Sequence, residues 1–298
     1  MGERNLTTKH TIMLVDGMSL LFRGYYATAY RGSIRRTSTG IPTNGIYTFV
    51  RYLWDAIQTF GPSHVVCCWD MGKTTFRTEL FSDYKANRPD PPFDLLPQFD
   101  LVKKVTESFN IPNIGIKGYE ADDVIGTIAL NHAPELNVHI LTGDNDLLQL
   151  VNERIHVIIM KKGFSNYAHF TPERVLEEKG LMPHQLRELK GLMGDASDNY
   201  PGVKGIGIKT AQKLLHQYES IDGILKNAED LPKGIRSKIM SQLDMLHLSH
   251  DLAKNRCDVP MSFSISECML SLDKGKIEKQ FEALEMQSLL KLLDDPFS

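Results

Sequence analysis

The sequence lacks the long apolar runs that mark membrane-spanning or exported proteins. TIMLVDGMSLLF is broken by Asp16 within six residues, well short of a membrane span. The first ten residues, MGERNLTTKH, lack the apolar core of a signal peptide. Cysteine is also scarce: Cys67, Cys68, Cys257 and Cys268 are the only four, and their spacing fits no zinc site. We therefore expect a cytoplasmic protein with reduced cysteines and no membrane partner.

The sequence also lacks a strong charge of either sign. Its 34 Lys and Arg residues against 37 Asp and Glu residues give a net charge of −3. This balance argues at first against a polyanionic partner such as nucleic acid. A length of 298 residues, with 42% hydrophobic residues, is sufficient for one large globular domain with a smaller one beside it.

Short apolar runs alternate with helical patterns in the first part of the chain. The runs predict buried parallel strands over 11–15, 64–69, 138–142 and 155–160. Helical periodicity is found between them over 44–60, 97–109 and 122–131, and later over 172–180, 183–193, 207–217, 232–255 and 275–293. The alternation predicts an α/β fold whose mostly parallel sheet is flanked by helices, followed beyond about residue 170 by a helical part.

The segment 76–100, FRTELFSDYKANRPDPPFDLLPQFD, follows neither period. Long irregular segments inside compact domains are usually functional or mobile, so we expect a flexible flap over the sheet. Its basic residues Arg77, Lys85 and Arg88 lie near the aromatic residues Phe76, Tyr84 and Phe93. Such a mixture suits phosphate contacts and base stacking, although a solvated amphipathic surface would look similar.

Acidic residues follow the predicted strands. The first strand ends in Asp16, the second is followed by Asp70, and EADDV at 120–124 begins a helix. Because ligands bind beyond the carboxyl ends of the strands in open α/β sheets, we expect these acids to gather at one rim. The nine candidates are Asp16, Asp70, Glu120, Asp122, Asp123, Asp144, Asp146, Asp195 and Asp198.

Nine carboxylates repel one another strongly unless cations neutralise them. Ligand sets made of oxygen alone select hard cations, so the cluster predicts Mg²⁺ or Mn²⁺. Asp122 or Asp123 could instead be chiefly a helix cap and Asp198 a turn former, and one or two of the nine are expected to support ligands rather than bind metal. Without these acids, 28 remain against 34 basic residues, an excess that suits a polyanion.

A glycine-rich turn follows the last acidic pair. GVKGIGIKTAQKLL at 202–215 contains Gly202, Gly205 and Gly207, with Lys204 and Lys209 beside them. A dinucleotide fingerprint requires a preceding strand, and 183–193 is predicted helical instead. A helix, a glycine turn and a second helix can bring backbone N–H groups against a phosphate. A plain connection between two helices is the alternative.

These motifs together resemble the bacterial and phage 5′ nuclease family, which includes flap endonucleases and the N-terminal 5′–3′ exonuclease domain of DNA polymerase I. The matching stretches are LVDGMSLLFR, VVCCWDMGKTTFRTELFSDYKANRP, YEADDVIGT, LTGDNDLLQLV and GLMGDASDNYPGVKGIGIKTA. They span about residues 11 to 215, and FEALEMQSLLKLL resembles the family's closing helix. Asn145 and Ile208 depart from the frequent Lys and Glu of the family motifs, which leaves fine substrate preference open.

The resemblance implies a PIN-like nuclease core over 11–170 with an arch at about 76–105, after a flexible N-terminus at 1–10. It also implies a helical DNA-binding part over 171–298, with a helix–three-turn–helix motif at about 183–217. All nine acids have family counterparts, which favours two Mg²⁺ ions, replaceable by Mn²⁺. Lys85 and Arg88 match arch residues that engage the scissile phosphate, and Arg77 matches a neighbouring basic position. In family members the turn commonly holds K⁺ through backbone carbonyls.

The resulting expectation is a free-standing, monomeric 5′ nuclease that hydrolyses 5′-ended or 5′-flap DNA in replication and repair. Glu120, Asp122, Asp144 and Asp146 would mainly hold the first metal, with Asp16, Asp70 and Asp123 near it. Asp195 and Asp198 would hold the second. A PIN-type RNase and a non-catalytic protein that binds branched DNA are the alternatives. A haloacid-type phosphatase fits less well, since it needs an aspartate where Met18 stands.

Overall fold

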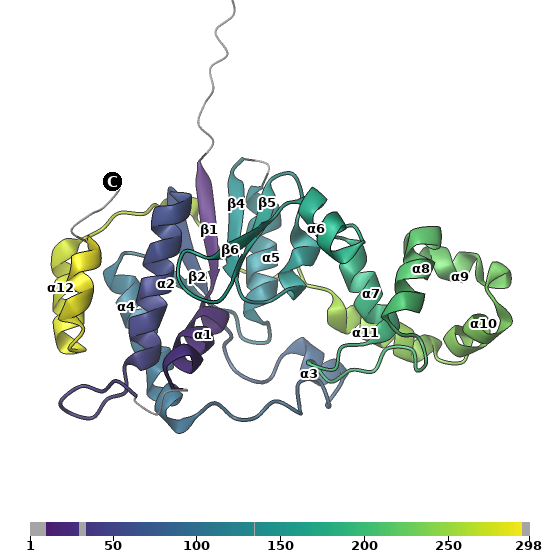
Figure 1. The fold of residues 1–298 in the computed structure, drawn as a ribbon, viewed down its shortest axis with the longest axis horizontal. Coiled ribbons are helices and arrows are strands. Elements are labelled where there is room, and N and C mark those ends of the chain that lie inside the picture. The colour runs from purple at the N-terminus through teal and green to yellow at the C-terminus, as the bar shows by residue number, and fades with distance from the viewer. Residues whose placement is uncertain (1–9, 30–33, 134, 294–298) are drawn as a thin grey trace, which may run out of the picture.

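The computed structural model describes residues 10–29, 34–133 and 135–293 (Figure 1). Apart from His10, the N-terminal segment predicted to be flexible lies outside these ranges. Within them, no helix combines the length and the apolar character that crossing a membrane requires.

A sheet in the order β3-β2-β1-β4-β5-β6 forms the centre of the described chain (Figure 1). Its strands are β1 (Thr11–Asp16), β2 (His64–Cys68), β3 (Asn113–Ile114), β4 (Asn137–Thr142), β5 (Ile155–Met160) and β6 (Tyr167–Phe170). All neighbouring strands are parallel except β5 and β6. The four predicted strands are confirmed. Two were missed, because β3 has only two residues and β6 is a short edge strand with alternating burial.

Helices cover both faces of the sheet. One face packs against α1 (Gly17–Ala29), α2 (Asn44–Phe60), α4 (Leu96–Ser108), α12 (Lys274–Ala283) and η5 (Gln287–Leu293). The other face packs against α5 (Ala121–His132), η2 (Asp146–Leu150), α6 (Pro172–Lys179) and η4 (Ile265–Cys268). Because each central strand buries side chains on both faces, β1 reads as one continuous apolar run. The predicted α/β class is therefore confirmed.

A separate helical part lies to one side of the sheet (Figure 1). It contains α7 (Gln185–Met193), α8 (Ile208–Tyr218), α9 (Ile221–Lys226), η3 (Ala228–Asp230), α10 (Lys233–Met240) and α11 (Leu243–Ala253) around their own apolar cluster. The single helix predicted over 232–255 is wrong. It breaks at Ser241 and Gln242, where the Gln242 side chain accepts a hydrogen bond from the Lys204 N–H at 2.9 Å.

The helix predicted over 275–293 is also interrupted. α12 ends at Ala283, and the chain turns at Glu285, which has a φ of 53°. The Glu285 carboxylate accepts a hydrogen bond from the Ser38 N–H at 2.9 Å. This tertiary bond, between residues 247 positions apart, holds the turn in place of a continuous helix.

The segment predicted as an irregular flap is only partly irregular. α3 (Phe76–Leu80) begins it, η1 (Phe93–Leu95) follows, and α4 starts at Leu96. The predicted arch limit near residue 105 is too late, because Val102 and Val105 of α4 are buried against the sheet. The stretch outside regular helices, 81–92, crosses the carboxyl ends of the strands and runs below them in the view of Figure 1.

Candidate active site

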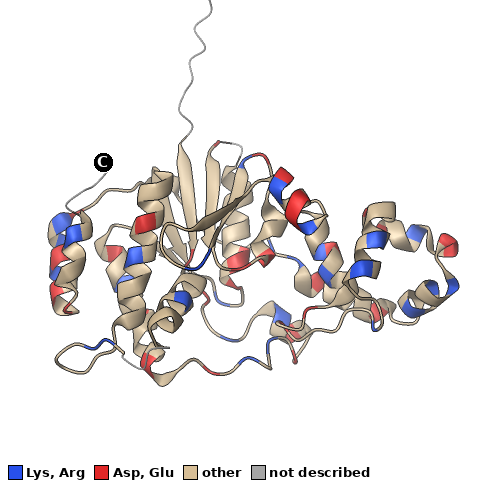
Figure 2. Cartoon of the chain, viewed as in Figure 1, with Lys and Arg blue, Asp and Glu red and all other residues tan. Residues whose placement is uncertain are grey.

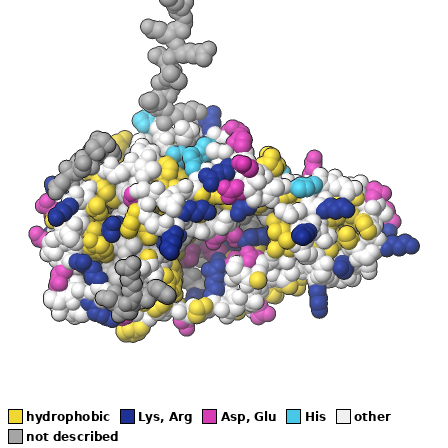
Figure 3. All heavy atoms as spheres, viewed as in Figure 1, with side chains coloured by type: hydrophobic (Ala, Val, Ile, Leu, Met, Phe, Trp, Pro, Cys, Tyr) yellow, Lys and Arg dark blue, Asp and Glu magenta, His cyan; other side chains and the backbone are white. Residues whose placement is uncertain are grey.

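The carboxyl ends of three parallel strands bring acidic side chains to one cavity. Asp16 is the last residue of β1, Asp70 follows β2 and Asp144 follows β4, while α5 begins at the same rim. A cavity of about 430 Å³ is lined by Asp16, Asp70, Glu120, Asp122 and Asp144. Figure 3 shows acidic side chains inside a hollow on this face, with basic side chains around it. The predicted convergence therefore holds for these five acids.

Hydrogen bonds fix two of these carboxylates at the rim. Asp16 accepts bonds from the Ser19 N–H at 2.9 Å and from the Thr142 hydroxyl at 2.7 Å. Asp70 accepts a bond from the Ala121 N–H, in the first turn of α5, at 2.6 Å. Each carboxylate keeps further lone pairs for another partner. Thr142 was not predicted from the sequence, because its contact requires β1 and β4 to be neighbours. The Ser19 contact, only three residues from Asp16, was also missed.

A second group of acids lies where the helical part meets the rim. Asp146, Asp195 and Asp198 each place one carboxylate oxygen within 4.8 Å of the others. Lys190 on α7 contacts both Asp146 and Asp195. Although burial acts to raise the pKa of Asp195, hydrogen bonds from Lys190 and Ser197 lower it to about 2. Lys190 was missed from the sequence, although it directly precedes the GLMGDASDN motif and lies five residues before Asp195.

Burial and mutual repulsion disfavour the charged form of several rim acids. Burial raises the pKa of Asp16 to about 7, and Asp70 and Asp144 add repulsion. Burial, with Asp16 and Asp144 nearby, raises the pKa of Asp122 well above its usual range. For Asp146, burial and Asp144 outweigh Lys190 and raise the pKa to about 6. Buried carboxylates in this arrangement are stabilised by cations.

These raised pKa values predict a pH-dependent affinity for Mg²⁺. A bound cation requires the ionised carboxylates, so binding releases their protons. The affinity is expected to rise by about tenfold per pH unit for each proton released, up to the pKa of about 7 at Asp16. Without metal, the same groups hold protons more tightly when folded than when unfolded, so their contribution to stability falls as pH rises toward 7.

Calorimetric titration of Mg²⁺ in buffers of different ionisation enthalpy would count the released protons. An affinity that stays constant from about pH 5.5 to pH 7.5 would contradict this account of the rim.

Asp123 differs from the other eight acids because protein donors inside the fold occupy both of its carboxylate oxygens. Its side chain is fully buried and receives both Arg77 guanidinium nitrogens, at 2.7 and 2.8 Å. It also accepts hydrogen bonds from the N–H groups of Glu120 and Arg256. These bonds tie the start of α5 to two distant segments, so the geometry favours the capping alternative for this residue.

Arg77 is correspondingly absent from the surface. Its side chain is 2% exposed and also donates to the backbone carbonyls of Leu252, at 3.0 Å, and Lys254, at 2.8 Å. The prediction that it contacts DNA phosphate does not agree with this burial, because every direction of the guanidinium is occupied by protein. The sequence could not show that Arg77 pairs with Asp123, because the two residues are 46 positions apart.

Replacing Arg77 by Met is expected to destabilise the protein by about 3–5 kcal/mol, because Asp123 would keep a buried charge without its partner. Urea unfolding with and without Mg²⁺ would measure the loss. The double variant Arg77→Met, Asp123→Leu should recover much of it, since both charges are then removed. A single variant within about 1 kcal/mol of the parent protein would place the pair outside the stabilising core.

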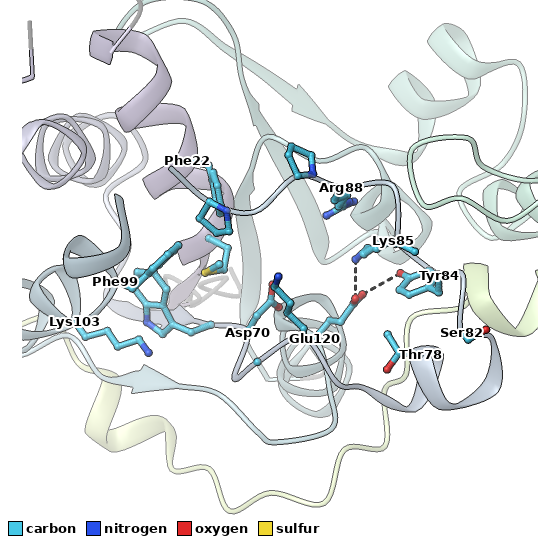
Figure 4. A pocket seen from close by; sticks show the side chains of 17 residues that line it. Phe22, Asp70, Thr78, Ser82, Tyr84, Lys85, Arg88, Phe99, Lys103 and Glu120 are labelled. Carbon is cyan, nitrogen blue, oxygen red and sulfur yellow. Dashed lines mark hydrogen bonds and ion pairs between the residues drawn. The ribbon is translucent and has the colours of Figure 1, made fainter. Parts of the chain in front are cut away.

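The arch places its other basic residues over the acids. The Lys85 ammonium donates to Glu120 at 2.7 Å, and Arg88 donates to Asp198 at 2.6 Å. Figure 4 shows both pointing toward the rim from above. Lys85 has a φ of 55°, and its N–H donates to the Asp198 carbonyl at 2.9 Å. Although burial opposes the charged form, Glu120 raises the pKa of Lys85 and keeps the ammonium protonated.

Tyr84 lies beneath this arch segment. It is 4% exposed, and its hydroxyl donates to Asp198 at 3.0 Å and to Glu120 at 3.2 Å. A ring this deeply buried offers no free face to a base, so its placement does not match the prediction of stacking. Phe93, in contrast, is 86% exposed. Beside the arch, a further cavity of about 520 Å³ is lined in part by Phe22 and Phe99 (Figure 4), and also by Trp69.

The glycine turn joins α7 to α8 and divides into a buried and an exposed half. Gly202 is buried at a φ of 62°, and a Cβ there would lie 2.2 Å from the Gly194 nitrogen. Its N–H donates to Ser249, so this glycine serves internal packing. The exposed members are Lys204, Gly205, Gly207 and Lys209. Lys and Arg residues also lie along α8 and α10 (Figure 2).

The comparisons with known proteins agree with this architecture. The family model for the N-terminal resolvase-like domain of 5′-3′ exonucleases matches residues 11–180, and that for the C-terminal SAM fold matches residues 181–276. The 5′-3′ exonuclease of Bacillus subtilis (strain 168) is 46% identical over 283 residues, covering 95% of this chain and 96% of that protein. The chain belongs to the 5′-3′ exonuclease family.

Two further relatives define its relation to larger and more distant proteins. DNA polymerase I of Bacillus caldotenax is 37% identical over 97% of this chain, which spans 33% of that polymerase. The crystal structure of the phage T5 flap endonuclease in a complex with DNA and metal ions has a TM-score of 0.67 and 20% identity. It covers 96% of this chain and 98% of the phage chain, which confirms the predicted fold.

Proposed function

We propose that this protein is a structure-specific 5′ nuclease that hydrolyses phosphodiester bonds in 5′-ended or 5′-flap DNA with two Mg²⁺ ions. The observation that carries the proposal is the rim of eight carboxylates roofed by the Lys85 and Arg88 cations. Family membership supports a nuclease, and the phage T5 flap endonuclease of similar fold is seen in a complex with DNA and metal ions. DNA replication and repair are the processes in which such substrates arise.

The donor set fits two hard cations. Carboxylates of Asp16, Glu120, Asp122 and Asp144 line the first cavity, whose lining contains no His or Cys, and Asp146, Asp195 and Asp198 form a second group. These ligands suit Mg²⁺ or Mn²⁺. When bound, the ions would activate a water molecule and offset the charge of the leaving oxygen. We leave Asp123 out of the ligand set, because Arg77 and two backbone N–H groups occupy it.

The arch residues act on the phosphate. Lys85 and Arg88 neutralise Glu120 and Asp198 in the absence of metal. Bound cations would take over that neutralisation and free both side chains to face a scissile phosphate. Tyr84 stays neutral, because burial raises its pKa, and its hydroxyl holds Glu120 and Asp198 in place. Together these groups position the phosphate and stabilise its developing charge.

In this proposal, the exposed half of the glycine turn binds the phosphate backbone of duplex DNA. Gly205 and Gly207 leave the backbone open to a phosphate, because the nearest atoms to a Cβ at Gly205 belong to the flexible Lys238 side chain, and nothing lies within 4 Å at Gly207. The Lys238 ammonium donates to the Gly205 carbonyl at 3.1 Å, so a cation already suits this turn. We expect K⁺ to bind this turn through backbone carbonyls and to strengthen duplex binding. Equal duplex affinity in KCl and in NaCl would contradict a K⁺ site at this turn.

Cleavage assays on three matched substrates test the proposal: a 5′-flap DNA, an RNA hairpin and a nicked duplex, each with Mg²⁺. We expect cleavage near the flap junction and from the nick, and little cleavage of the RNA hairpin. Preferential RNA cleavage would instead indicate a PIN-type RNase. Tight binding without cleavage would indicate a non-catalytic protein that binds branched DNA. Sedimentation of the protein with one flap DNA would test whether it acts as a monomer.

A further inference from the structure

Three histidines from adjacent strands share one face of the sheet, away from the acidic rim. His139 of β4 lies directly beside His156 of β5 in the parallel register. His169 of β6 pairs with Ile158, two residues after His156 and on the same face. Figure 3 shows histidine side chains gathered on the surface over these strands. The group lies near the amino ends of β4 and β5, whereas the acids lie beyond their carboxyl ends.

The ring nitrogens of the three histidines converge. One nitrogen from each ring lies within 4.8 Å of the others. His156 Nδ1 and His169 Nε2 are 2.9 Å apart. His139 Nδ1 is buried and has no hydrogen-bond partner among the described residues. Buried polar atoms are normally paired, so this nitrogen indicates a missing partner at His139, one of the three converging rings.

The surroundings keep these imidazoles neutral. Burial, with His169 and His156 nearby, lowers the pKa of His139 to about 4. Burial also lowers the pKa of His156 and of His169. Phe60, at the end of α2, packs its ring edge against His139 and His169. Neutral imidazoles in an apolar setting are the form that binds transition metals.

We propose that His139, His156 and His169 form a binding site for a divalent transition metal of the zinc class, separate from the Mg²⁺ rim. Imidazole ligands suit Zn²⁺, Ni²⁺ and Cu²⁺, whereas carboxylates suit Mg²⁺. Three histidines leave a fourth position for water, as is common for zinc. The ion would join edge strand β6 to β5 and β4, and so stabilise the one antiparallel pair of the described sheet. This site does not depend on the proposed nuclease activity.

Thr142, whose hydroxyl binds Asp16 in the rim, follows His139 by three residues, or roughly 10 Å of extended strand. The two sites can therefore be loaded separately. The test is calorimetric titration of the full chain with Zn²⁺ after chelator treatment, in excess Mg²⁺ to occupy the carboxylates. We expect one Zn²⁺ per chain, a higher melting temperature with Zn²⁺, and visible absorption typical of tetrahedral nitrogen ligation when Co²⁺ replaces it.

His156→Asn is expected to weaken this binding by at least about tenfold. His64→Asn is the matched control, since His64 begins β2 at the same end of the sheet and should leave Zn²⁺ affinity unchanged. If His156→Asn fails to fold, modification of the parent protein by diethyl pyrocarbonate gives an independent reading, because Zn²⁺ should protect the three histidines. Binding that Mg²⁺ abolishes, binding that His156→Asn leaves unaltered, or no protection of these rings would overturn the proposal.

Discussion

Replacing both Asp144 and Asp146 by Ala is expected to abolish Mg²⁺-dependent cleavage of 5′-flap DNA and leave the protein folded. Asp144 faces the first acidic cavity, and Asp146 belongs to the second group with Asp195 and Asp198. The double variant therefore removes ligands from both proposed metal positions at once. Losing the ions removes both water activation and charge stabilisation, each a large share of such catalysis.

Stability separates this catalytic loss from unfolding. Repulsion by Asp144 contributes to the raised pKa of Asp16, Asp122 and Asp146, so removing these charges should relieve strain in the metal-free protein. Its melting temperature without metal should not fall, and its stabilisation by Mg²⁺ should disappear. Asp222→Asn, on the exposed first turn of α9, is the control. Substantial Mg²⁺-dependent activity in the folded double variant would remove this pair from the active site.

Replacing Lys85 by Ala is expected to lower single-turnover cleavage by about 10²–10³ and to affect flap-DNA affinity far less. The ammonium lies 2.7 Å from Glu120 at the edge of the acidic cavity, where charge develops on a phosphate during the reaction. A contact that strengthens in the transition state changes the rate more than the binding. Single-turnover rates at saturating enzyme, beside binding measured with Ca²⁺ in place of Mg²⁺, would separate the two effects.

Lys103→Ala is the matched control for this experiment. Lys103 carries the same charge as Lys85. It lines the neighbouring cavity beside the arch, with its ammonium 5.6 Å from the Trp69 ring centre. Its loss should weaken binding slightly, with a salt dependence typical of an outer phosphate contact. A Lys85 variant that behaves like the Lys103 variant would take Lys85 out of the catalytic group.

The central sheet could be predicted because strands that are buried on both faces appear in the sequence as continuous apolar runs. Runs such as TIMLV and HVVCC need no knowledge of their neighbours to be read as parallel strands. The acids that end those strands follow from the same reading, since parallel carboxyl ends meet at one edge. β6 was missed because an edge strand alternates, and its partner β5 is recognised only once the sheet is assembled.

The roles of individual site residues were less predictable, because they depend on contacts between distant segments. Arg77 was predicted to contact phosphate, and Asp123 to line the metal site or cap a helix, yet the two form a buried pair. Lys190 lies in the helix predicted over 183–193 and was not selected as a site residue, yet it bridges Asp146 and Asp195. Residue type shows that a charge is present, but only the fold shows whether its partner is a metal, a phosphate or another side chain.

Helix α7 has a geometric consequence for the products of the reaction. Lys190, near its carboxyl end, contacts Asp146 and Asp195, and the glycine turn that would hold the duplex begins at Gly202, shortly after Asp198. α7 also packs closely on α11, and the Gly194 backbone touches the turn. Under the proposed function, the distance from the duplex-binding glycine turn to the metal-binding acids is therefore fixed. The rigid connection between α7 and its turn would then determine how many nucleotides separate the bound duplex from the cleaved bond.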